Sequence, residues 1–84
     1  TLTKAGLDLS LYPNPTSHQL HITSLSTITH VSVFDLSGRS LFEQALLAKE
    51  ATVDVRPLPD GVYILEATDT QGAVQRVKFI KAAN

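Results

Sequence analysis

Apolar and polar residues alternate along most of the chain with a period of two, as in a β-strand that buries one face. The clearest alternating segments are residues 7–11, 20–23, 31–36, 53–55, 62–68 and 73–81. Residues 40–47 alternate less regularly, and a short helix there is an alternative to a strand. If this segment is counted as a strand, the pattern predicts about seven short strands, which is typical of an all-β antiparallel sandwich.

Three glycines, Gly38, Gly61 and Gly72, separate consecutive apolar runs. Glycine at such a position supplies the positive φ that tight turns need. In DLSGR we expect Gly38 to occupy the left-handed position of a hairpin bulge. We therefore expect two hairpin turns and one stiffer crossing between the sheets, at residues 35–39, 68–73 and 56–61 respectively.

The first two alternating runs are separated by Tyr12-Pro13-Asn14-Pro15. Proline fixes φ and has no backbone donor, so neither ring fits in a central strand ladder. Each residue before a proline is also restricted to extended geometry. The stretch is therefore predicted to be a rigid corner that leaves Asn14 accessible.

Size and composition indicate one folded domain. A chain of 84 residues has room for one core, and 43% hydrophobic with 18% charged residues is ordinary for a folded protein. There is no cysteine, which excludes disulfides and thiolate chemistry, and a net charge of −1 gives no general attraction to nucleic acid or anionic lipid. Because the chain starts Thr1-Leu2-Thr3, we expect part of a longer protein, with a flexible lead-in at residues 1–6 and the domain at 7–84.

The residues suggest no catalytic, cofactor or metal site. His18, His21 and His30 are the only histidines, and in a strand the first two would point to opposite faces. Serine, histidine and aspartate all occur, but at no spacing that would activate a nucleophile. A filled sandwich of this size also rarely leaves a pocket. We therefore expect a protein that is not an enzyme and that has no small-molecule substrate.

Charge is distributed unevenly. Residues 43–69 contain six acids, whereas residues 70–84 contain Arg76, Lys78 and Lys81 and no acid. In a terminal strand, Arg76 and Lys78 would share one face. One interpretation is a solvated face whose lysines protect a sheet edge from stray pairing. The other is a basic strand offered to a receptor. Composition does not decide between them.

Four short pieces occur in a definite order: YPNP (12–15), DLSGR (35–39), LPDGVY (58–63) and KFIK (78–81). Each piece alone is found in many β-proteins. Together they resemble the C-terminal sorting domain of the type IX secretion system, also called the Por secretion system. The resemblance extends from about residue 7 to residue 81.

The resemblance implies a seven-stranded, immunoglobulin-like sandwich at the end of a secreted protein of a Gram-negative bacterium. Such a protein enters the periplasm by its own signal peptide, and a shuttle protein and the outer-membrane translocon then handle the folded domain. A sortase-like peptidase typically removes the domain and anchors the cargo at the cell surface, while other cargo is released. Neither nucleic acid nor a small molecule is an implied partner.

Lys78 and Lys81 are the residues we expect to be most important for recognition, because exposed lysines have little structural reason to stand there. Tyr63 is expected in the core, and Gly38 and Gly61 are expected to serve backbone geometry first. The full set of candidate recognition residues is Lys78, Lys81, Arg76, Pro13, Asn14, Pro15, Gly38, Arg39, Gly61 and Tyr63.

Two other interpretations remain. A surface binding module, such as an adhesin or a carbohydrate-binding sandwich, would usually display an aromatic platform. The chain has only five aromatic residues, at least three of which follow the core alternation, so few remain for a platform. A structural spacer is the other possibility, and it would tolerate loss of the last ten or so residues.

Overall fold

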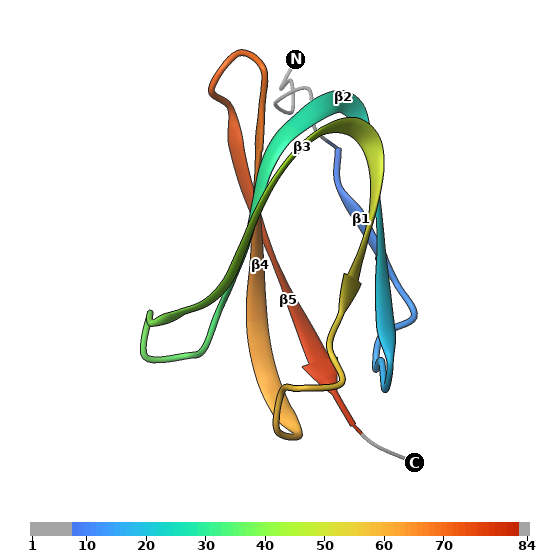
Figure 1. Ribbon diagram of the computed structural model, residues 1–84, viewed down its shortest axis with the longest axis vertical. Coiled ribbons are helices and arrows are strands. Elements are labelled where there is room, and N and C mark those ends of the chain that lie inside the picture. The colour runs from blue at the N-terminus through green and yellow to red at the C-terminus, as the bar shows by residue number, and fades with distance from the viewer. Residues whose placement is uncertain (1–7, 83–84) are drawn as a thin grey trace, which may run out of the picture.

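The computed structural model describes residues 8–82, which form five β-strands and no helix (Figure 1). The strands are β1 (Ser10–Tyr12), β2 (Gln19–Phe34), β3 (Ser40–Asp54), β4 (Gly61–Asp69) and β5 (Val74–Lys81). The all-β prediction is confirmed, and residues 40–47 belong to a strand. No segment of this described range is a helix able to cross a bilayer. The predicted lead-in at residues 1–6 lies outside the described range.

The predicted count of seven strands is wrong because two pairs of expected strands are continuous. Strand β2 joins the segments expected at 20–23 and 31–36, and β3 joins most of those expected at 40–47 and 53–55. Figure 1 shows β2 and β3 bending together over the top of the molecule. At the bend, the pairing moves five positions along β2 (23 to 28) but only two along β3 (50 to 48). Such an irregularity lets a strand turn without ending.

The bend divides the molecule into two antiparallel layers. Before the bend, β2 pairs with β1 and with the last part of β3. After the bend, β2 pairs with β4 on one side and with the first part of β3 on the other, and β4 pairs with β5. Strand β5 therefore ends the larger layer. The connection at residues 55–60 crosses from one layer to the other, as expected for RPLPDG.

The core lies between the layers and contains the inward-facing members of each alternation. Both halves of β2 contribute: Leu20, Ile22, Val31 and Val33 are fully buried. Strands β4 and β5, in the same layer as the second half of β2, add further residues, among them Phe79, which is also fully buried. A buried side chain of this size stabilises the fold by roughly 1.5–3 kcal/mol relative to exposure. The alternation read from the sequence thus identifies the core.

The two hairpins share one turn design. Gly38 and Gly72 have φ values of 93° and 85°, in the region that favours glycine. Three positions before each glycine stands an aspartate, Asp35 or Asp69. Its Oδ1 accepts hydrogen bonds from the backbone N–H groups two and four positions later, at distances between 2.8 and 3.0 Å. Both predicted hairpin turns are confirmed.

The prediction for Gly61 is wrong. Gly61 is the first residue of β4, and its φ lies outside the left-handed region. A Cβ there would meet the ring of Tyr63 at 3.8–4.0 Å, which is ordinary contact. The turn before β4 is instead formed by the preceding residues, so Gly61 is not required for a positive φ.

Candidate recognition surface

Three of the four sequence pieces meet at one end of the sandwich. The 13–15 corner, the β3–β4 connection and the C-terminal end of β5 all lie in the lower part of Figure 1. The 35–39 hairpin also lies low in this view but to the left, away from the other three pieces. Backbone and side-chain hydrogen bonds hold these three pieces together.

The corner pairs with the end of β5. The backbone N–H of Thr16 donates to the carbonyl of Ile80, and the N–H of Ala82 donates to the carbonyl of Thr16, each at 2.9 Å. Thr16 and Lys81 form a parallel β-bridge. The Oδ1 of Asn14 accepts a hydrogen bond from the N–H of Ile80 at 2.9 Å. The interruption between the first two strands is therefore a short extra pairing segment on the edge of β5.

Lys81 does not belong to the exposed surface. It is only 6% exposed, and its Nζ donates to the carbonyl of Leu58 at 2.8 Å and lies 3.6 Å from Oδ1 of Asp60. The reason is the alternation of β5, which places Val77, Phe79 and Lys81 on one inward face. The expectation that Lys81 is exposed is wrong, and the contacts give this lysine a structural role.

Tyr63 is in the core, as expected, with 6% of its surface exposed. Its hydroxyl donates to the carbonyl of Pro59, and its ring stacks on Phe79 with centroids 5.7 Å apart. Tyr63 thus holds the β3–β4 connection against the inner side of β5. Its side chain has little surface left for a partner.

The outer face of the larger layer carries the exposed cations of β5. The guanidinium of Arg76 lies 2.8 Å from the carboxylate of Glu66 on the neighbouring strand. Lys78 makes no ion pair within residues 8–82. It lines a shallow hollow with Asn14, Val62 and Ile80, which we call the Lys78 hollow. Pro13 and Pro15, on either side of Asn14, are exposed.

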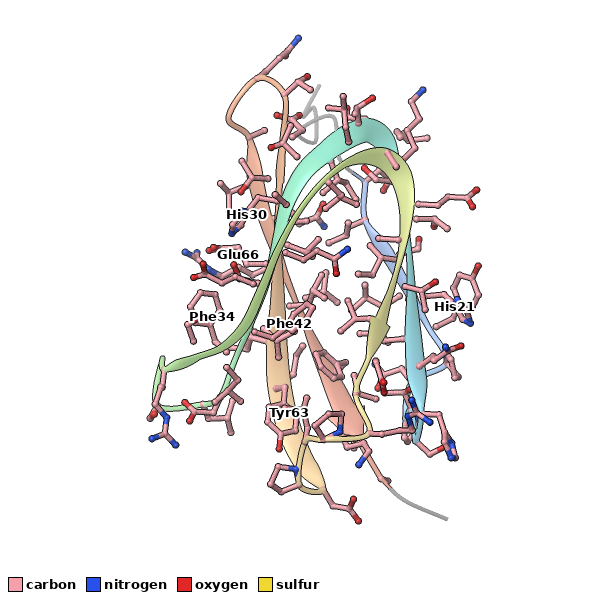
Figure 2. The ribbon with its side chains drawn as sticks, viewed as in Figure 1. His21, His30, Phe34, Phe42, Tyr63 and Glu66 are labelled. Atoms are coloured by element: carbon pink, nitrogen blue, oxygen red, sulfur yellow. The ribbon has the colours of Figure 1, made fainter. Side chains whose placement is uncertain are left out.

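A second hollow lies further along the same face and reaches the 35–39 hairpin. Its lining includes Phe34, Gly38, Ile64, Glu66 and Arg76. Figure 2 shows Phe34 and Glu66 on this outer side, whereas Phe42 points between the layers. Both acids that line this hollow lie within ion-pair distance of an arginine, Glu66 of Arg76 and Asp35 of Arg39, so the second hollow presents a neutralised surface.

The 35–39 hairpin displays Arg39, whose side chain is 76% exposed and whose Nε lies 3.4 Å from Oδ2 of Asp35. The pKa of Asp35 lies below its ordinary value, chiefly because the Ser37 hydroxyl donates to the carboxylate and then because the Arg39 N–H does. The hairpin thus holds an ionised aspartate and an accessible arginine. Gly38 contributes the backbone geometry that this arrangement needs.

The histidines are dispersed. His21 stacks on Tyr12 with ring centroids 5.2 Å apart, on the smaller layer, while His30 lies 4.0 Å from Glu43 on the larger one (Figure 2). No three side chains of histidine, aspartate or glutamate within residues 8–82 are grouped so that they would hold a metal ion.

The fold and these contacts agree with the family match. Residues 10–82 match the secretion system C-terminal sorting domain, and the chain belongs to this family. The resemblance seen in the four sequence pieces is thereby confirmed. No curated protein matches the chain.

Two solved structures show the same fold. The first is PorZ of Porphyromonas gingivalis, described as an essential bacterial surface component of the type IX secretion system. It is 20% identical over 88% of this chain, with a TM-score of 0.73, and the chain spans only 11% of PorZ. The second is a DUF3244 family protein of Bacteroides vulgatus with an immunoglobulin-like β-sandwich fold. It is 18% identical, the match covers 90% of this chain and 96% of that protein, and the TM-score is 0.69. The immunoglobulin-like fold is thus confirmed.

The sequence reading missed Thr16, Leu58, Val62 and Ile80. Val62 and Ile80 could have been identified from the sequence. Apolar residues stand at both inward and outward positions of β4 and β5, as in strands that are covered on both faces. Thr16 and the Leu58 carbonyl could not, because their roles depend on residues far along the chain.

Proposed function

We propose that this domain is the folded signal that directs a cargo protein through the outer-membrane translocon of the type IX system. The supporting observation is the junction of the 12–15, 58–63 and 78–81 pieces at one end of the sandwich. Pieces from three parts of the sequence become neighbours only after folding. A receptor reading this end would therefore bind the folded domain in preference to an extended tail.

The proposal includes the later steps implied by the family. The cargo passes through the periplasm with the help of a shuttle protein. A sortase-like peptidase then removes the domain, and the cargo is anchored at the cell surface or released. The domain itself acts by being bound, without catalysis.

The test is a transport assay. Residues 1–84 are fused to the C-terminus of an inert periplasmic reporter and expressed in a type IX-competent host and in a translocon-deficient one. We expect the reporter at the surface or in the medium of the competent host only, and shortened if the domain is removed. Full-length reporter outside the cell would support sorting without removal. Periplasmic retention in both hosts, with the domain folded, would contradict the proposal.

The binding-module alternative has no aromatic platform in the described structure. Tyr63 and Phe79 are buried, and Phe42 packs against the core. The remaining two, Tyr12 and Phe34, lie on different layers. Saturable binding of the 84-residue chain in a glycan screen would restore that alternative.

A further inference from the structure

The Lys78 hollow combines an apolar surface with a cation. Val62 and Ile80 are direct cross-strand partners on the outer face of β4 and β5, and Ile64 and Lys78 form the next pair. Ile80 is 42% exposed although it is a large apolar residue. An apolar patch bordered by polar groups is typical of a surface that binds another molecule.

The charge of Lys78 is not neutralised within the described structure. Six lysines and arginines lie within residues 8–82, and four have a carboxylate within ion-pair distance: Arg39, Arg56, Arg76 and Lys81. The two without one are Lys49 and Lys78. Lys78 is the one of these two that borders a hollow with apolar walls.

Asn14 adds neutral hydrogen-bond donors to the same hollow. Its Oδ1 is occupied by the N–H of Ile80, which fixes the amide and leaves the Nδ2 group with no hydrogen bond to another residue of the 8–82 range. The hollow therefore offers an ammonium and an amide NH₂, which are both donors. A carboxylate satisfies two such donors at once, and the apolar walls suit a neighbouring aliphatic or aromatic side chain.

We propose that the Lys78 hollow is the docking site for a segment of a partner protein that presents a carboxylate next to an apolar side chain. This proposal rests on the proposed sorting function and identifies the surface of the domain that the partner protein would bind. Lys78 acts as the charged contact, and Val62 and Ile80 form the apolar floor. Lys81 contributes indirectly, by holding the end of β5 in place.

Substitutions that change the charge of Lys78 in the reporter fusion test this proposal. Lys78→Glu should lower export about tenfold or more, because it places a like charge against the partner's carboxylate. Lys78→Arg should keep most of the export, because it retains the cation. Lys49→Glu is the matched control, since it makes the same charge change at the other unpaired lysine, and it should leave export unchanged.

Two substitutions on β5 test the apolar floor of the Lys78 hollow. Ile80→Glu should reduce export, whereas Val74→Glu should not, although Val74 is similarly exposed at 46% and does not line the Lys78 hollow. Thermal unfolding of each purified variant shows whether the fold is intact. A variant that unfolds is replaced by the milder Lys78→Gln or Ile80→Thr.

The outcomes separate the two proposals. If the wild-type fusion is exported and Lys78→Glu is exported equally well, the docking site is wrong and the sorting function stands. If the wild-type fusion is not exported, the sorting function itself fails. Co-sedimentation of the 84-residue chain with phosphatidylglycerol vesicles, abolished by Lys78→Glu, would assign the hollow to anionic lipid and overturn a protein partner. Self-association at micromolar concentration, abolished by the same variant, would assign it to a second copy.

Discussion

The side-chain Oδ1 of Asn14 accepts a hydrogen bond from the backbone N–H of Ile80, 66 positions later in the sequence, at 2.9 Å. This contact attaches the proline-flanked corner to the strand that ends the larger layer. Together with the two backbone hydrogen bonds of Thr16, it pairs the final residues of β5 on a side that would otherwise be open. The order of the C-terminal end therefore depends on the corner.

Asn14→Ala should destabilise the domain by about 1 kcal/mol, the usual net value of one hydrogen bond. The Ile80 N–H would lose its acceptor, while the backbone of the corner would stay in place. Urea unfolding followed by circular dichroism measures the change. Asn14→Asp keeps an acceptor oxygen and should lose less stability, and equal losses for both variants would show that the hydrogen bond is not the cause.

Lys81→Met should destabilise the domain by about 1–3 kcal/mol, because it retains most of the apolar stem but leaves the partly buried carbonyl of Leu58 without a donor. Lys78→Met is the matched control on the outer face and should change stability by no more than about 0.5 kcal/mol. The difference in unfolding midpoint between the two variants is the measurement. Equal midpoints would contradict the structural role of Lys81.

Gly38→Ala should destabilise the domain by about 1–2 kcal/mol, because an L-residue is disfavoured at a φ of 93°. Gly61→Ala should leave stability unchanged or raise it by up to about 1 kcal/mol, since its φ is ordinary and alanine restricts the unfolded chain. Thermal unfolding of the pair provides the comparison. A loss at Gly61 as large as at Gly38 would mean that space, and not φ, limits both positions.

Acid should remove the contribution of the Asp54–Arg56 pair. The hydrogen bonds from the Arg56 side chain, followed by its backbone N–H, lower the pKa of Asp54 from 3.8 to about 2. A folded-state pKa below the unfolded value stabilises the domain above the unfolded pKa, and this contribution is lost as the pH falls through the folded pKa. We expect wild type to be more stable than Asp54→Asn at pH 7, and the difference to vanish between pH 3.8 and about 2. Urea midpoints of both proteins across this range measure it, and a difference that persists at the lowest pH would contradict the assignment.

Local patterns in the sequence were sufficient to predict several parts of the molecule. The alternation predicted all-β structure and the inward positions of β2, β4 and β5. The two turns built on Asp35 and Asp69 were also predictable, because each is made by an aspartate and a glycine three positions apart. The four short pieces were sufficient to indicate the family. The alternation and the two turns depend on residues within one strand or one turn, and the family indication depends on the order of the four pieces along the chain.

Other features were decided by the tertiary structure. The alternation read from the sequence stops at residue 23 and resumes at residue 31, and only the common bend of β2 and β3 shows that the segments on either side are continuous, so that seven expected segments form five strands. The burial of Lys81 depends on the carbonyl of Leu58, 23 positions earlier in the sequence. The exposure of Ile80 depends on how much of its side chain is covered by neighbouring residues of β4 and of the 13–15 corner. Periodicity indicates which side chains share a face. The contacts across the sandwich decide whether a lysine on that face is buried as part of the structure or remains available for recognition.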